Sequence, residues 1–167
     1  MKTRMLSQLL ALGLFLSLVY GAQNGPVILT GADLARVVPA GFYFEGLSAP
    51  TQMRNAAAAR FGQKQHVIAG LVDTSGYSSD VRAKYEGFLI TDLNISINDQ
   101  ELGVGAYGFG FTNDGRFNVM DISGKQILST AAAQDSNLRR PRPLMMVQTP
   151  DGVRLYSGRS YVTIKAR

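Results

Sequence analysis

Apolar and small residues alternate most clearly between positions 101 and 121. Five consecutive positions show the alternation: Tyr107, Gly108, Phe109, Gly110 and Phe111. Successive side chains of a strand point to opposite faces, so the aromatic rings share one face and the glycines the other. The sequence Asn-Asp-Gly at 113–115 is typical of a turn, and the alternation resumes after it. The pattern therefore predicts a β-hairpin.

Other apolar runs predict further short strands. They cover 42–44, 66–73, 85–93, 95–97, 122–129, 144–148, 153–156 and 161–164. Residues 51–61 contain a run of alanine that favours a helix by propensity. Gly and Pro bracket this segment and its neighbours resemble strands, so we expect it to be extended. Two residues that commonly cap the N-terminus of a helix predict helical turns. Thr30 is expected to cap a short helix that reaches Val38, and Ser78 or Ser79 is expected to cap one turn that reaches Lys84.

Three segments are interpreted as interruptions of these strands. Ser48-Ala49-Pro50 is expected to break the chain, Pro150-Asp151-Gly152 to turn it, and 130–137 to form a polar connection for which a helical turn is one interpretation. About eight or nine short strands remain, with turn signals at the spacing of a sandwich or barrel. The sequence predicts a mainly β fold: an antiparallel β-sandwich or small barrel with one or two short helical turns.

The first 21 residues have the layout of a secretory signal peptide. Lys2 and Arg4 precede an apolar run of eleven residues, Leu9 to Val19, and cleavage is expected after Gly21. This run is short for a transmembrane span, which needs ~20 residues. We expect a single β-rich domain over 22–167, periplasmic or secreted, with no transmembrane span after cleavage. An uncleaved anchor is the alternative.

Composition narrows the chemistry. The chain has no cysteine, so disulfides and thiolate metal sites are excluded. With 46% hydrophobic and 17% charged residues, it suits one domain held together by core packing. No metal or cofactor is expected, because His66 is the only histidine and has no close Asp/Glu cluster beside it in the sequence. A phosphate-binding loop and a serine nucleophile elbow are also missing.

Charge is unevenly distributed along the chain, whose formal net charge is +5. From Arg139 to the C-terminus, seven basic residues accompany one acidic residue, Asp151. Arg139, Arg140 and Arg142 stand on a segment stiffened by two prolines. These arginines are candidate binding residues for an anionic component of the cell envelope, although a solvated face that aids solubility is the simpler interpretation. Export makes nucleic acid an unexpected partner.

The sequence Leu71-Val72-Asp73-Thr74-Ser75-Gly76 is similar to the active-site loop of aspartic proteases. In those enzymes an Asp follows apolar strand residues and precedes Thr or Ser and then Gly, and two such Asp residues share one proton. Here Ser75 stands where that Gly belongs, and the sequence lacks a second copy, so catalysis would require a homodimer. The alternative is a strand that ends in a turn begun by Asp73.

The glycine face of the hairpin is a second candidate site. Gly108 and Gly110 leave one sheet face without side chains, next to the row of aromatics that includes Tyr107. An open slot there would accept a small apolar ligand, so these three residues are candidate binding residues. Close packing of protein interiors favours the other possibility, that an aromatic side chain of the protein fills the slot. The tyrosines considered for this are Tyr43, Tyr77, Tyr85, Tyr156 and Tyr161.

Several stretches together resemble a group of small exported bacterial β-rich proteins with no assigned activity. They are Ser48-Ala49-Pro50-Thr51-Gln52 with Arg54-Asn55, 71–77, Gly105-Ala106-Tyr107-Gly108-Phe109-Gly110, Arg140-Pro141-Arg142-Pro143-Leu144 and Arg154-Leu155-Tyr156. The resemblance covers most of 22–167 and implies export and a β-rich fold, but no catalytic residue.

The leading functional hypothesis is a non-enzymatic β-domain of the cell envelope that binds a ligand or a partner. An aspartic-type hydrolase acting as a homodimer through Asp73 is the alternative. An outer-membrane barrel is disfavoured, because the strands are short against the ~9–11 residues needed to span a membrane.

Overall fold

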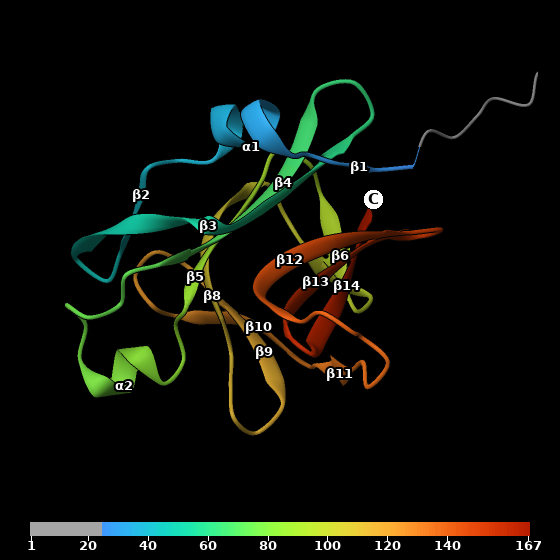
Figure 1. The fold of residues 1–167 in the computed structure, drawn as a ribbon. Coiled ribbons are helices and arrows are strands. Elements are labelled where there is room, and N and C mark those ends of the chain that lie inside the picture. Colours follow the sequence, from blue (N-terminus) through green and yellow to red (C-terminus); the bar gives the residue numbers. More distant parts are fainter. Residues whose placement is uncertain (1–24) are drawn as a thin grey trace, which may run out of the picture.

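The computed structural model describes residues 25–167, so the expected signal peptide over 1–21 lies outside the described residues. Two antiparallel sheets face each other (Figure 1). The mainly β class is confirmed, and the arrangement is that of a β-sandwich. Among the described strands, the two sheets do not close into a barrel.

Eight strands form the larger sheet: β1 (Val27–Ile28), β2 (Gly41–Phe44), β3 (Leu47–Phe61), β4 (Gln65–Val72), β5 (Gly87–Thr91), β8 (Gly105–Phe111), β9 (Arg116–Met120) and β10 (Gln126–Ala131). Their order across the sheet is β1-β3-β4-β5-β8-β9-β10, and β2 also pairs with β3. The predicted hairpin is confirmed as β8 and β9, in which Phe111 pairs with Phe117 across a turn that contains Gly115 at φ 78°.

Six strands form the smaller sheet: β6 (Ile95–Ile97), β7 (Gln100–Leu102), β11 (Ala133–Gln134), β12 (Arg142–Thr149), β13 (Gly152–Gly158) and β14 (Ser160–Ala166). Their order is β12-β13-β14-β6-β7, and β11 also pairs with β14. The two expected helices are present as α1 (Gly31–Val37) and α2 (Ser79–Arg82). The Ser78 hydroxyl accepts a hydrogen bond from the Val81 N–H at the start of α2.

Three expectations about the strands are wrong. β3 runs through Ser48-Ala49-Pro50 without a break. At Pro50 the strand changes partners from β2 to β4, so the missing N–H of proline costs little there. No helical turn forms over 130–137, where the end of β10 and the two-residue strand β11 lie instead. The described strands number fourteen rather than eight or nine, because strands as short as β1 and β11 are too brief to produce a detectable alternation.

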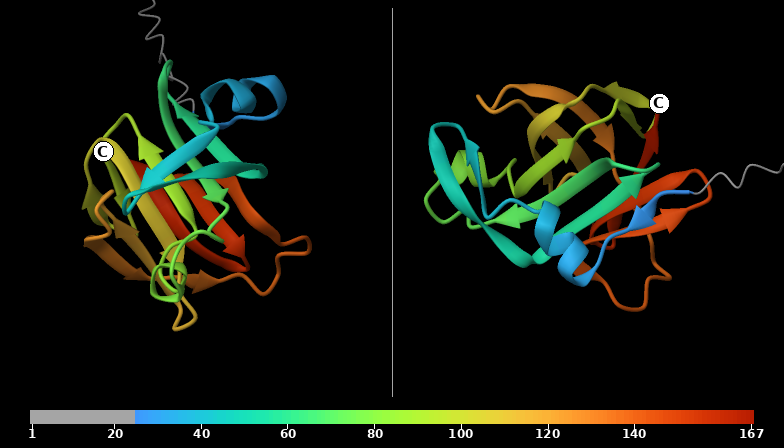
Figure 2. Two further views of the ribbon diagram at one scale, coloured as in Figure 1. Left: turned by 90° about the vertical axis from the view of Figure 1, so that its left-hand side faces the viewer. Right: turned by 90° about the horizontal axis from the view of Figure 1, so that it is seen from above.

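Two hydrophobic clusters lie on opposite faces of the larger sheet. The first fills the space between the sheets and includes Phe109, Phe117 and Leu155. The second lies on the outer face of the larger sheet and includes Phe44, Tyr85 and other residues that β2, α1 and the segment around α2 contribute. Figure 2 shows α1, β2 and α2 arranged along that outer face. The larger sheet is therefore covered on both faces, which explains the nearly continuous apolar sequence of β4.

Candidate functional site

The slot over Gly108 and Gly110 is filled by the protein itself. A Cβ added at Gly108 would lie 2.4 Å from the ring of Phe44, and one added at Gly110 would lie 2.2 Å from the carbonyl oxygen of Lys84. The Phe44 ring stacks on Tyr85, with 3.9 Å between the ring centroids. The filling ring over Gly108 is thus a phenylalanine backed by one of the expected tyrosines, and no space is left at these glycines for an apolar ligand.

Tyr107 lies on the other face of β8, and its ring packs against the cluster between the sheets. Its hydroxyl donates a hydrogen bond to the carbonyl of Gly103 at 2.9 Å. Burial raises the pKa of the Tyr107 hydroxyl, so the group is a neutral donor near neutral pH. The Tyr107 side chain therefore stabilises the loop that begins at Gly103, and it does not contribute to the face of Gly108 and Gly110.

Asp73 begins a turn, as the alternative interpretation of its motif expected. Its Oδ1 accepts a hydrogen bond from the Ser75 N–H at 3.0 Å, and its carboxylate is exposed. The hydrogen bonds from Ser75 lower the pKa of Asp73. A carboxyl that shares a proton with a second carboxyl needs the opposite shift at one of the pair. The geometry therefore gives the hydrolase hypothesis no support.

His66 lies at the other end of β4 from Asp73, so these two residues do not form a catalytic pair. The Nδ1 of His66 is 3.5 Å from Oδ2 of Asp92, while its backbone N–H donates to Oδ1 of Asp92 at 2.6 Å. Within residues 25–167 the side chains of His, Asp and Glu form no group of three that could hold a metal ion.

The seven basic residues near the C-terminus fall into two groups. Four are engaged with other groups: Arg154 with the ring of Tyr161, Arg159 with the carbonyls of Asp135 and Ser136, Lys165 with Asp99, and Arg167 with Glu101. Arg139, Arg140 and Arg142 are exposed, and within residues 25–167 their side chains form no ion pair or hydrogen bond. The free charge of this region is thus concentrated at the start of β12.

A groove lies between β3 and β12, and Arg142 is part of its wall. Figure 2 shows β1 and α1 running beside these two strands. Its volume is about 340 Å³. Most of its wall is apolar: Ile28, Leu29, Leu34, Met53, Ala56, Ala57, Leu144, Met145 and Met146. Arg54 and Arg142 are the charged residues of the wall.

A wide bulge in β3 shapes one side of this groove. β3 leaves its register with β4 between Thr51 and Ala56. Two side chains support the bulge: Gln52 Nε2 donates to the carbonyl of Val72 at 3.0 Å, and Asn55 Nδ2 donates to Gln52 Oε1 at 2.8 Å. Because bulged residues leave the ladder, the strand can aim them away from the sheet. Met53 and Arg54, in the middle of the bulge, lie in the wall of the groove.

A second bulge lies across the groove, in β12. Arg142 pairs with Gly158 and Met145 with Tyr156, so β12 carries one more residue than β13 over this stretch. The bulge coincides with Pro143, which cannot donate to a ladder. It brings the exposed side chain of Arg142 to the same groove as Arg54, and the two strands supply one arginine each.

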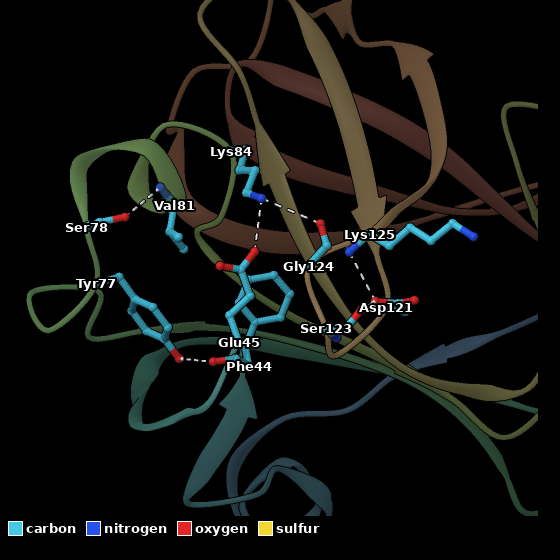
Figure 3. Close-up of polar contacts among 10 residues, drawn as sticks. All are labelled: Phe44, Glu45, Tyr77, Ser78, Val81, Lys84, Asp121, Ser123, Gly124 and Lys125. Atoms are coloured by element: carbon cyan, nitrogen blue, oxygen red, sulfur yellow. Dashed lines mark hydrogen bonds and ion pairs between the residues drawn. The ribbon is translucent and has the colours of Figure 1, made fainter.

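A different surface depression lies where the turns at 45–46 and 121–125 meet the end of α2. Figure 3 shows the polar contacts among the residues around it. Its volume is about 780 Å³. Here Lys84 Nζ donates to Glu45 Oε1 at 2.9 Å and lies 3.5 Å from the carbonyl oxygen of Gly124. A Cβ on Gly124 would overlap the Glu45 carboxylate, at 1.7 Å. Lys84 and Glu45 pair with each other and connect three loops, so we interpret this surface as structural.

Glu86 is a partly buried carboxyl that needs a structural explanation. Its Oε2 accepts a hydrogen bond from the Phe111 N–H at 2.9 Å. Burial raises the pKa of Glu86, and the bond from Phe111 only partly opposes that rise. The folded state therefore holds this proton more tightly than the unfolded state, so the contribution of Glu86 to stability falls as pH rises from the ordinary carboxyl pKa through the raised pKa.

We expect Glu86→Gln to be more stable than the wild type at pH 7. The amide keeps an oxygen that accepts from the Phe111 N–H, and it removes the cost of a buried charge. Urea unfolding at a series of pH values measures the difference between the two proteins. That difference should grow through the window above the ordinary carboxyl pKa; a constant difference would show that the charge of Glu86 is not the cause.

The groove residues of β3 were missed by sequence reasoning. Met53 and Arg54 stand in a segment that was expected to be extended, with no sign that it would leave register. The polar pair Gln52 and Asn55 was the available signal, because such side chains can hold a bulge through hydrogen bonds. The sequence identified Arg142 as a candidate binding residue, but it did not identify Arg54 on the other side of the groove.

Comparison with models of protein families, with curated proteins and with solved structures gave no match. Neither α1 nor α2, nor any other helix within residues 25–167, has the length and apolar character needed to cross a membrane.

Proposed function

We propose that this chain is a non-enzymatic binding domain whose ligand occupies the groove between β3 and β12. The observation that carries the proposal is the pair of exposed arginines, Arg54 and Arg142, beside a wall of methionine, leucine and alanine. Such a combination suits a ligand with an anionic head and an apolar body. Methionine side chains adapt to irregular apolar ligands because they are unbranched and polarisable.

The size of the groove supports a small ligand or part of a larger one. Its volume of about 340 Å³ is near the lower end of the range of roughly 300–1,000 Å³ that is typical of ligand pockets. The ligand class that fits is an anionic amphiphile: a short alkyl chain that ends in a phosphate or carboxylate. Arg139 and Arg140 would add long-range attraction that weakens as the salt concentration rises.

The site of action we propose is the cell envelope, in the periplasm or after secretion. The signal-peptide pattern over 1–21 supports this proposal, as does the ligand class, since anionic amphiphiles are the material of membranes. A relationship to the small exported bacterial β-rich proteins that the sequence resembles is part of the same proposal.

Octyl phosphate, used below its critical micelle concentration, is a suitable probe, and 1-octanol is the comparison without the charged head. We expect the double variant Arg54→Glu with Arg142→Glu to bind octyl phosphate at least about tenfold more weakly, since each lost charge-assisted contact contributes on the order of 1 kcal/mol at an exposed site. Isothermal titration calorimetry measures this loss.

The matched control is Arg60→Glu with Arg82→Glu, which changes the net charge equally at exposed positions outside the groove. This control should bind octyl phosphate nearly as the wild type does. An equal loss in both double variants would show that only net charge matters and would reject the groove as the site. Binding of 1-octanol as tightly as octyl phosphate would reject the role of the arginines.

A further inference from the structure

A second pocket lies on the outer face of the smaller sheet, away from the groove. In β14 the residues Tyr161, Thr163 and Lys165 alternate with Val162 and Ile164, which are fully buried in the cluster between the sheets. The first three therefore face outward, and they line a pocket of about 520 Å³. This volume is typical of ligand sites.

Two turns form the walls of this pocket. One is the β6–β7 turn, in which Asn98 and Asp99 have φ of 46° and 67°. Its position is fixed by Asn98, whose Oδ1 accepts from the Thr163 N–H at 2.9 Å and whose Nδ2 donates to the carbonyl of Ala131 at 2.9 Å. The other is the β12–β13 turn, which contributes Asp151. The wall formed by the β6–β7 turn is thus held to the sheet by hydrogen bonds and does not depend on a ligand.

The floor of the pocket is a rigid network. The Arg154 guanidinium lies over the ring of Tyr161, 4.4 Å from its centroid. Arg154 is also 3.5 Å from the hydroxyl of Tyr156, and that hydroxyl donates to Oδ2 of Asp135 at 3.0 Å. Preorganised polar groups of this kind lower the cost of ordering a site when a ligand binds.

The charges in the pocket balance. Asp99 and Asp151 are opposed by Arg154 and Lys165, and the pair between Lys165 and Asp99 is long, at 3.9 Å. Neither sign of charge dominates, so the pocket has no preference for a strongly charged ligand. It offers carboxylate acceptors, cationic donors and the Thr163 hydroxyl around one aromatic ring.

Thr149 supplies an unmet hydrogen-bonding group in the same pocket. Thr149 lines the pocket, yet its Oγ1 is buried and has no hydrogen-bond partner within the described residues. An unpaired buried hydroxyl lowers stability. Rotation about χ1 can move Oγ1 into the position of the methyl group or of the Cβ hydrogen, so a ligand hydroxyl in the pocket can provide the partner that the fold does not.

We infer that this pocket binds an uncharged saccharide. A sugar hydroxyl both donates and accepts, which matches the mixture of donors and acceptors here, and a neutral sugar matches the balanced charge. Because Arg154 lies over the face of the half-buried Tyr161 ring, the ring offers a sugar an apolar contact at its exposed edge. The inference stands apart from the groove and its anionic ligand, because the two sites share no residue.

Maltotriose and N,N′,N″-triacetylchitotriose are the probes, titrated at millimolar concentration into the ¹⁵N-labelled chain 22–167 and followed by amide chemical shifts. The expected shifts are confined to 98–100, 149–152 and 161–165. Thr149→Val should leave the unfolding midpoint unchanged or raised, and it should weaken sugar binding roughly threefold to tenfold, as expected for one lost hydrogen bond. Arg142→Glu, in the groove, should leave sugar binding unchanged.

The inference is overturned if neither sugar shifts these amides, or if the shifts appear along the groove instead. Unchanged affinity in Thr149→Val would also overturn the role of its hydroxyl. Lys165→Met provides a second variant should Thr149→Val fold poorly, since it removes a partly exposed ammonium group while keeping an unbranched apolar stem. Loss of sugar binding with intact octyl phosphate binding would separate the two sites.

Discussion

Replacing Phe44 by alanine is expected to lower the free energy of unfolding by about 3–5 kcal/mol. The side chain is fully buried, and its ring lies directly against the bare backbone of Gly108. It also stacks on Tyr85 and meets the edge of Tyr77, at a centroid distance of 6.3 Å. Because the glycine has no side chain that could move into the cavity, the space left by the ring would remain largely empty. Urea unfolding followed by circular dichroism measures the loss.

Tyr43→Ala is the matched control for that variant. It removes an aromatic ring from the adjacent position of β2, but Tyr43 points outward and is 53% exposed. Its stability should change by less than about 1 kcal/mol. If Tyr43→Ala and Phe44→Ala were equally destabilised, β2 rather than the contact with Gly108 would be the source of the effect.

Gly110→Ala is expected to cost about 3 kcal/mol or more, which is large for one added methyl group. The new Cβ would lie 2.2 Å from the carbonyl oxygen of Lys84 and 3.2 Å from the nitrogen of Tyr85. These are backbone atoms, so relief requires the whole segment to shift. That shift would displace the Tyr85 ring and strain the ion pair between Lys84 and Glu45.

Gly103→Ala makes the same chemical change where there is room. The nearest atom to a Cβ at that position is 4.0 Å away, and its φ is not positive. Its free energy of unfolding should stay within about 0.5 kcal/mol of the wild type. Thermal unfolding of both variants provides the comparison. A wild-type midpoint for Gly110→Ala would mean that the segment at 84–85 does not rest on β8.

The alternation in β8 was sufficient to predict which face carries rings and which carries glycines. It was not sufficient to predict what covers the glycines. Phe44 reaches Gly108 only because β2 folds over the outer face of the larger sheet, which depends on contacts between segments remote in sequence. Tyr43 is among the tyrosines expected to fill the slot, yet it points outward while its neighbour Phe44 points inward. A two-residue period fixes relative faces, not which face is buried.

The candidate groove was predictable only in part. The proline-flanked arginines indicated a charged segment, and Arg142 lies at the groove as an exposed residue. The opposite wall depends on the loss of register between β3 and β4, which a hydrophobic pattern does not report. The interpretation of Ser48-Ala49-Pro50 as a break failed for a related reason. A proline is compatible with a strand wherever the strand changes partners, and that depends on the topology.

β12 is an edge strand of the smaller sheet, and this position affects how copies of the protein associate with one another. Among the strands of residues 25–167, none pairs with the outer backbone groups of β12 in that sheet, and such margins invite a second molecule to add its own strand. Pro143 lacks one of the required donors, Arg142 brings charge, and the bulge between Arg142 and Met145 bends the margin away from straight pairing. The residues that open the groove thus also protect the protein from aggregation through its sheets.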